Sequence, residues 1–342
     1  MISIFGAVEI TFRLTFPEFN GDIHSDQLTH GKFRRYSKLF GYQVRSFDNK
    51  DEVNISPNEK VVLVLGDSIS DGFGHSYHDI WWSQLERLLK IKDKNYKFIS
   101  ISGFGNNFTD NIDNGVNLIS KLERANVKPY KIIYQFNYND IQPYRKIDLK
   151  KINNISKFEI DFAKWRYGYL NKSVAARVIQ HYAGILRKET SGSCDERSLD
   201  ALGAYTWSFG SKNEVNNSEK SWLNFSKNVS GFHTFLSNRD IKFEIMISPI
   251  LYQIDQLGLH PNYNHLNLDF SCATIDPHKK LIDISSTNFI TIYDATNYLR
   301  TMFENKIKDN NFEPFYFNAD DNHITPLASG YIAEFIAIKW ID

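Results

Sequence analysis

An unbroken apolar run followed at once by a small polar tripeptide most constrains the fold of this chain. The run covers 61–65, VVLVL, and the tripeptide is Gly66-Asp67-Ser68. Five consecutive apolar residues are typical of a strand buried on both faces, as in a parallel sheet. The segment 79–91 then repeats apolar residues at helical spacing. Ser68 is therefore expected at the carboxyl end of a buried strand, where α/β sheets place their reactive groups.

Strand and helix patterns alternate along much of the chain. The pattern predicts strands over 61–65, 97–102, 130–136, 243–249 and 290–294, and helices over 79–91, 110–125 and 326–341. Strand–helix–strand alternation at this spacing produces a parallel sheet with right-handed crossovers. The predicted fold class is α/β, a three-layer α/β/α sandwich around a central parallel sheet.

Two segments depart from this alternation. Residues 1–58 are polar and aromatic-rich without clean periodicity, and we expect an N-terminal extension to a domain spanning 59–342. Residues at about 143–240 are rich in Lys, Asn, Ser and aromatics, and predict an inserted, partly helical segment with helices near 157–187 and 219–237. Its Trp and Tyr side chains fit either core packing or a platform on which sugars stack.

Composition excludes several classes of partner and site. The 342 residues carry 40 basic and 40 acidic side chains, so nothing in the charge balance indicates nucleic acid. The two cysteines, Cys194 and Cys272, cannot make a zinc site by themselves, and one disulfide is allowed but not implied. Residues 1–8 are apolar but lack a basic segment, which argues against a signal peptide. They are either the first element of the domain or the stub of a membrane anchor.

A serine nucleophile needs a base, a group that orients the base, and donors for an oxyanion. Among ten histidines only His323 has an aspartate, Asp320, three residues before it. That spacing on a loop lets the carboxylate accept from Nδ1–H and leaves Nε2 free for Ser68. Asp321 is a rival with poorer reach. Thr325-Pro326 follows as a helix start, so His323 is expected on a short loop before the last helix.

Oxyanion donors are expected at the ends of the next two strands. Gly103 closes the strand over 97–102, where a glycine allows close approach to a backbone N–H. Asn139 follows the strand over 130–136 and offers a side-chain amide. The Ser68 backbone N–H completes the predicted oxyanion hole of Ser68, Gly103 and Asn139.

These four blocks resemble the SGNH or GDSL hydrolases. Gly66-Asp67-Ser68, Gly103, Asn139 and the Asp320-x-x-His323 pair match the family's blocks in order, each at an expected strand end. The resemblance covers roughly 59–142 and 243–342, and it implies a flavodoxin-like fold and a Ser68–His323–Asp320 triad that cleaves esters. One departure is Asn137, which stands where the third block usually has glycine, and it is expected to crowd the pocket or narrow the substrate range.

Other kinds of site fit less well. The chain has neither a Gly-x-Ser-x-Gly elbow nor a phosphate-binding Gly-Lys-Ser/Thr loop. Asp320, Asp321 and His323 offer metal ligands without a second cluster, so we expect neither a metal nor a cofactor. His75 and His78 are expected at the pocket rim or on the surface rather than as the base.

The predicted function is hydrolysis of a carboxylic ester through Ser68. The resemblance implies small acyl groups on carbohydrates, or lipid esters, and the aromatic insertion favours a carbohydrate O-acetyl ester. Residues 9–18 look like the region after a membrane anchor in some bacterial members, which favours an extracytoplasmic, glycan-modifying role. Two alternatives stay open: an acyltransferase that passes the acyl group to a sugar hydroxyl, and a catalytically silent glycan-binding protein.

Overall fold

The computed structural model describes residues 2–15, 35–37, 42–46, 55–72, 75–103, 106–141, 173, 175, 178–179, 212–255, 275–316 and 323–341. Asp320, Asp321, Cys194 and Cys272 lie outside these residues. The predicted helix near 157–187 is described only at 173, 175, 178 and 179, so it stays a prediction.

Seven strands form one sheet in the order β1-β2-β4-β3-β5-β6-β7. Their bounds are β1 Arg35–Ser37, β2 Tyr42–Ser46, β3 Lys60–Leu65, β4 Tyr96–Ser100, β5 Lys131–Phe136, β6 Lys242–Ile247 and β7 Thr291–Asp294. β4, β3, β5, β6 and β7 are parallel to one another. Counted along the chain, these five have the order 2-1-3-4-5, which is the flavodoxin-like arrangement. The predicted α/β fold with a central parallel sheet is confirmed.

The N-terminal segment contributes two strands that the sequence pattern does not predict. β1 pairs with β2, and β2 pairs with β4, both in antiparallel fashion. Residues 35–37 and 42–46 of the expected extension therefore belong to the sheet. The whole sheet is mixed, with a parallel centre and an antiparallel margin.

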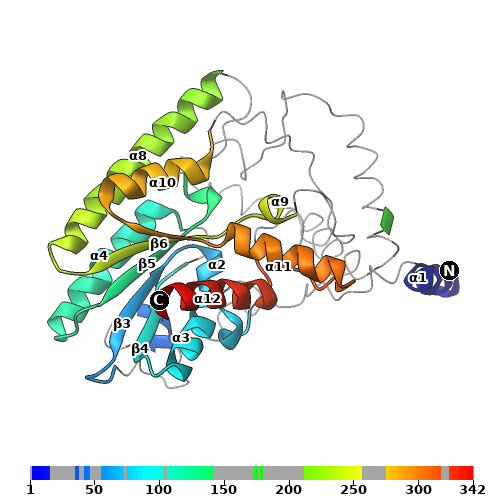
Figure 1. Ribbon diagram of the computed structural model, residues 1–342, viewed down its shortest axis with the longest axis horizontal. Helices are drawn as coiled ribbons and strands as arrows, with labels where there is room; N and C mark the ends of the chain where they lie inside the picture. Colours follow the sequence, from blue (N-terminus) through cyan, green and yellow to red (C-terminus); the bar gives the residue numbers. More distant parts are fainter. Residues whose placement is uncertain are drawn as a thin grey trace.

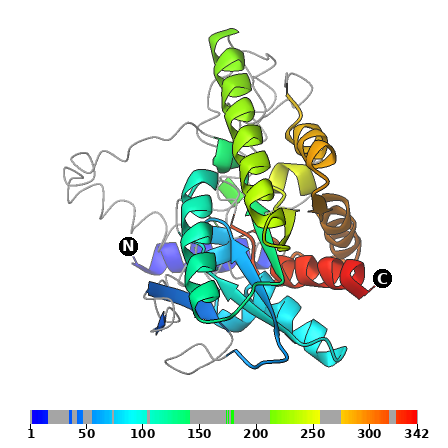
Figure 2. The ribbon, with the colours of Figure 1, turned by 90° about the vertical axis from the view of Figure 1, so that its left-hand side faces the viewer.

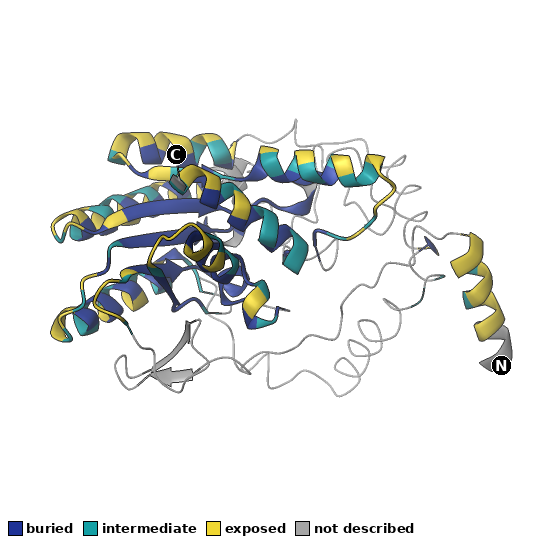
Figure 3. Ribbon diagram, turned by 60° about the horizontal axis from the view of Figure 1, so that its bottom comes forward, coloured by how far each residue is buried: buried dark blue, intermediate teal, exposed yellow. Residues whose placement is uncertain are grey.

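Helices cover both faces of the sheet, as Figures 1 and 3 show. One face packs against α4 (Phe108–Arg124), α8 (Lys212–Ser237) and α10 (Pro277–Asn288). The other packs against α3 (Trp81–Ile91), α11 (Thr296–Lys308) and α12 (Pro326–Ile341). Figure 2 turns the molecule so that the long α8 faces the viewer.

β3 supplies side chains to both cores, as its uninterrupted apolar run requires. Val61, Leu63 and Leu65 lie in the core under α4 and α8. Val62 and Val64 lie in the core under α3 and α12. All five are at most 1% exposed. Successive side chains of a strand point to opposite faces, so only a sheet covered on both sides buries such a run.

Most element bounds lie within a few residues of the predicted ones. α12 matches its predicted range, and α3 begins two residues later than predicted because a short 3-10 helix, η2 (Tyr77–Asp79), precedes it. α8 begins well before 219. α10 and α11 are not predicted from the sequence.

The first helix, α1 (Ile2–Thr15), lies away from the sheet in Figure 1. Its apolar side chains are largely exposed, at 42% for Val8, 60% for Ile10 and 78% for Leu14. Glu9 of α1 accepts hydrogen bonds from Ser173 Oγ (2.8 Å) and from Ala175 N–H (3.3 Å). None of the helices within the described residues has the length and apolarity needed to cross a bilayer.

Candidate active site

Ser68 begins a short helix at the carboxyl end of β3. This helix, α2 (Ser68–Asp71), is capped by Asp67, whose Oδ1 accepts the Ile69 N–H at 3.0 Å. Gly72 ends it in a left-handed conformation with φ of 79°. Ser68 is 6% exposed. Because Ser68 is the first residue of the helix, its N–H has no partner inside the helix.

His323 lies against this serine although the two are 255 positions apart. Its Nε2 is 2.7 Å from Ser68 Oγ, within hydrogen-bond distance. The backbone beside it is fixed: Ile324 forms an antiparallel bridge with Tyr316, and Thr325 N–H donates to Phe315 O at 2.8 Å. Thr325 Oγ1 also donates to Pro314 O at 2.7 Å, immediately before α12 starts. The expected orienting carboxylate, Asp320, lies outside the described residues.

Gly103 lies at the predicted strand end, but its N–H is directed toward the sheet. It donates to Gly66 O at 3.4 Å, a long contact that continues the β3–β4 hydrogen-bonding pattern. Asn106 folds back over this glycine, since a Cβ on Gly103 would lie 2.9 Å from Asn106 Nδ2. The Gly103 N–H, one of the three expected oxyanion donors, therefore already has a backbone partner, although a distant one.

The backbone of the third expected donor, Asn139, lies in a 3-10 turn, η3 (Tyr138–Ile141), directly after β5, and its side chain is outside the part of the chain that the structure describes. The neighbouring residues fix this turn: Asp140 N–H donates to Asn137 O at 3.0 Å, and Asn137 N–H donates to Asp140 Oδ2 at 2.7 Å. β5 is adjacent to β3, so the turn follows the strand next to the one that carries Ser68.

Asn137, which was expected to crowd the pocket or narrow the substrate range, has a side-chain partner inside the protein. It is 3% exposed, and its Nδ2 donates to Asp67 Oδ2 at 2.8 Å. Asp67 is the residue before the serine. Asn137 therefore links the end of β5 to the turn that presents Ser68.

This link brings two buried carboxyl groups together. Asp67 is 0% exposed and Asp140 is 6% exposed. Burial, followed by the charge of Asp67, raises the pKa of Asp140 well above its usual range, against hydrogen bonds from Tyr134 and the Asn137 backbone. The raised pKa means that Asp140 favours its protonated form. It does so beside Asp67, the residue that caps α2, whose first residue is Ser68.

The two histidines near Ser68 in sequence have different places. His78 is exposed, as expected. His75 is 3% exposed and its Nε2 contacts Ser329 Oγ of α12 at 3.2 Å, so it is a buried residue rather than one of the pocket rim. Its ring ties the segment after α2 to the helix that follows His323.

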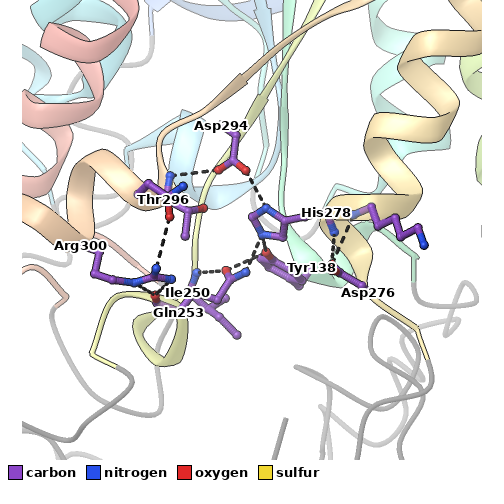
Figure 4. Close-up of polar contacts among 10 residues, drawn as sticks. Tyr138, Ile250, Gln253, Asp276, His278, Asp294, Thr296 and Arg300 are labelled. Carbon is purple, nitrogen blue, oxygen red and sulfur yellow. Dashed lines mark hydrogen bonds and ion pairs between the residues drawn. The ribbon is translucent and has the colours of Figure 1, made fainter. Parts of the chain in front are cut away.

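A histidine–carboxylate pair that the sequence pattern does not reveal lies further along the same edge of the sheet (Figure 4). His278 Nδ1 is 2.7 Å from Asp294 Oδ2. On the other side of the ring, Nε2 contacts Tyr138 Oη and Gln253 Nε2. These residues come from four elements, so spacing along the chain carries no signal for them.

The pKa of Asp294 is lowered in this pair. Burial acts to raise its pKa, but hydrogen bonds and charge from His278, with further hydrogen bonds from Thr296, outweigh burial and lower it. Its Oδ1 accepts the Thr296 N–H at 3.0 Å. Over the described residues, no group of three or more His, Cys, Asp or Glu side chains is placed to hold a metal ion.

Comparison with known proteins identifies similar structures only. Models of protein families give no match to this chain, and neither do curated proteins. Among solved structures, TesA is similar at TM-score 0.42 and 10% identity, over 83% of this chain and 100% of that one. A lipase/acylhydrolase from Enterococcus faecalis has a TM-score of 0.41 and 9% identity, over 82% and 94% of the two chains.

A catalytic mutant of Axe2, an acetylxylan esterase from Geobacillus stearothermophilus, has a TM-score of 0.41 and 11% identity, over 84% of this chain and 96% of that one. All three likenesses are distant. The functional conclusion therefore depends on the contacts within this chain.

Proposed function

We propose that this protein hydrolyses carboxylic esters by acyl transfer through Ser68. The observation that carries the proposal is the 2.7 Å contact between His323 Nε2 and Ser68 Oγ at the carboxyl end of β3. A hydroxyl held against an imidazole nitrogen is the arrangement that activates a serine at neutral pH. The resemblance of the four sequence blocks to SGNH hydrolases supports the same chemistry.

In this mechanism His323 takes the proton from Ser68 Oγ as the oxygen attacks the ester carbonyl carbon. The tetrahedral intermediate collapses, the bond to the alcohol oxygen breaks, and His323 returns the proton to the departing alcohol. Water, deprotonated by His323, then attacks the acyl-enzyme; the bond to Ser68 Oγ breaks, His323 returns the proton to Oγ, and the acid leaves. Asp320 is assigned to orient His323 through Nδ1.

The oxyanion is assigned to the Ser68 N–H, the Asn139 amide and the Gly103 N–H. The Ser68 N–H is free of helical partners because of its position at the start of α2. The Gly103 N–H must exchange its 3.4 Å contact with Gly66 O for the substrate oxygen. Such contacts are often loose before substrate binds.

For the substrate we propose an O-acyl ester of a carbohydrate, with a short acyl group such as acetyl. The aromatic-rich segment at about 143–240 supports this choice, and so does the name of the similar acetylxylan esterase. A comparison of p-nitrophenyl acetate with longer esters and acetylated sugars tests acyl length. Product analysis with and without a sugar acceptor separates hydrolysis from acyl transfer.

Labelling by a fluorophosphonate tests the activated serine directly. We expect one adduct on Ser68 in the intact-protein mass, and none in Ser68→Ala or His323→Ala. Both variants are expected to lose about 10⁴- to 10⁶-fold in turnover of p-nitrophenyl acetate.

His233→Ala is the matched control, because among the described residues the hydrogen-bond partner of His233 is a neighbour on its own helix, Ser237 Oγ, at 3.3 Å. It should label and turn over like the wild type. A folded wild-type protein without an adduct, or a Ser68→Ala variant with full turnover, would contradict the proposal.

A further inference from the structure

The Asp294–His278–Tyr138 contacts have the order of a catalytic triad, but the residue at the end of the series is not available to a substrate. Tyr138 is 0% exposed. Burial, followed by the charge of Asp294, raises the pKa of its hydroxyl well above the usual range. A neutral phenol sealed in the interior cannot act as a nucleophile, so these residues must serve another purpose.

The ring of His278 contacts side chains on both of its edges. Asp294 Oδ2, a carboxylate oxygen, accepts from Nδ1–H at 2.7 Å. Nε2 contacts Gln253 Nε2 and the Tyr138 hydroxyl, which donates to Gln253 Oε1 at 2.7 Å. The tyrosine hydroxyl is thus held from two sides, as Figure 4 shows.

Each partner of Tyr138 is itself fixed by backbone contacts. Gln253 Oε1 accepts the Ile250 N–H at 3.0 Å, and Arg300 donates to Gln253 O at 2.7 and 3.0 Å. His278 follows Asp276, whose Oδ1 caps α10 through the His278 N–H at 2.9 Å. Asp294 lies at the end of β7. The hydrogen bonds among Tyr138, Gln253, His278 and Asp294 therefore connect the segments that follow β5 and β6 and the end of β7 to the start of α10.

Tyr138 is also the residue immediately before Asn139, in the same one-turn 3-10 helix. We infer that Asp294, His278 and Gln253 hold Tyr138 so that the η3 turn keeps Asn139 at the oxyanion position. The three are positioning residues, and the inference rests on the proposed function of Asn139. In this arrangement His323 serves proton transfer at Ser68, and a separate histidine–carboxylate pair, His278 with Asp294, sets the geometry of an oxyanion donor.

A double-mutant cycle on p-nitrophenyl acetate hydrolysis tests this assignment. Tyr138→Phe keeps the ring and removes the held hydroxyl, and we expect kcat to fall about 10- to 100-fold with KM changed less than about twofold. If Tyr138 acts through Asn139, the double variant Tyr138→Phe/Asn139→Ala has the kcat of Asn139→Ala alone. Independent, multiplied effects would overturn the inference.

Tyr298→Phe is the matched control, since that tyrosine lies in the first turn of α11 and its hydroxyl bonds Glu334 Oε2 of α12 at 3.3 Å. It should keep the kcat of the wild type. A loss in Tyr138→Phe no larger than in this control would overturn the inference, and so would full activity in Asn139→Ala, because no donor would then need positioning.

Hydrogen exchange separates this inference from the proposed function. Amide exchange is measured by mass spectrometry on a peptide that covers 137–141, in the absence of substrate. His278→Ala is expected to speed exchange in this peptide by about tenfold, with His233→Ala unchanged. If the wild type hydrolyses no ester, the proposed function fails and exchange alone decides. Unchanged exchange in His278→Ala would overturn the positioning role.

Discussion

At the scale of single residues, Asn137 connects the nucleophile's turn with the turn after β5. Its side chain donates to Asp67 at 2.8 Å and its backbone donates to Asp140 at 2.7 Å. In proteins with glycine at this position the first of these bonds has no side-chain donor. Asn137 departs from the glycine that the sequence resemblance leads us to expect, and it adds a hydrogen bond to the buried side chain of Asp67.

Replacing Asn137 by alanine removes the amide that donates a hydrogen bond to Asp67 Oδ2. A buried hydrogen bond to a charged group contributes about 1.5–3 kcal/mol, and we expect a loss of that size in the free energy of unfolding. Denaturant unfolding measures it. Asn95→Ala is the control, because Asn95 makes an exposed 3.4 Å contact with Asn58 O, and it should cost far less. Equal losses would contradict the role given to Asn137.

The chemistry of the candidate site was predictable in part because its groups follow local patterns. Ser68 directly follows a buried strand, and His323 directly precedes a helix, so each has a signal within a few residues. His278 and Asp294 have none. Their pairing depends on α10 lying beside the end of β7, and Tyr138 joins them from β5. Likewise, the sequence does not reveal that the Gly103 N–H continues the sheet.

At the scale of elements, a buried ion pair joins β5 to β6 near their starts. Lys131 Nζ is 2.6 Å from Glu244 Oε1, and the two side chains are 8% and 9% exposed. Burial lowers the pKa of Lys131, with Glu244 opposing that shift. The ammonium also lies 3.8 Å from the centre of the Trp340 ring on α12. The Lys131 side chain thus connects β5 with β6 and with α12.

Removing this lysine should be costly, because Glu244 would remain buried without its cation. Lys131→Met is expected to lower the free energy of unfolding by about 3–5 kcal/mol. Lys128→Met breaks a pair of the same type with Asp240, at 3.1 Å but with side chains 59% and 90% exposed. That variant should lose less than about 1 kcal/mol. Similar losses in urea unfolding of the two variants would contradict the difference in burial.

The accuracy of the element predictions follows from burial. Strands enclosed on both faces, such as β3 and β5, are mostly apolar and were predicted nearly to the residue. β1 and β2 read RYS and YQVRS, short polar stretches whose pairing with β4 creates the strand. α10 packs a single row of apolar side chains in a polar sequence, PHKKLIDISSTN, so its helical pattern is weak.

At the scale of the whole molecule, the buried Asp140 gives folding a dependence on pH. Its pKa is raised in the folded protein, so above the unfolded value of about 3.9 the folded state binds a proton that the unfolded state releases. The free energy of unfolding therefore falls as pH rises between these two pKa values. Below the unfolded value both states are protonated and the contribution vanishes.

Asp140→Asn removes this titration and retains an oxygen that can accept the Asn137 N–H. We expect the variant to gain stability relative to the wild type as pH rises from about 4 toward neutrality. Urea unfolding over that range measures the difference at each pH. The exposed Asp113, replaced by asparagine in the same way, serves as the control and should show no such trend. A difference that shrinks with rising pH would contradict the burial assigned to Asp140.

The pairing of β2 with β4 has a consequence for the solubility of any shortened form of the chain. Unpaired strand margins offer free amide and carbonyl groups to which a foreign strand adds, and this is a common route to aggregation. Arg45 and Ser46 of β2 lie opposite Ser100 and Ile99 of β4. A chain that starts at residue 59 would leave that side of β4 bare. The first 58 residues thus include a strand, β2, that occupies the backbone groups of β4 and so hinders the addition of strands from other molecules.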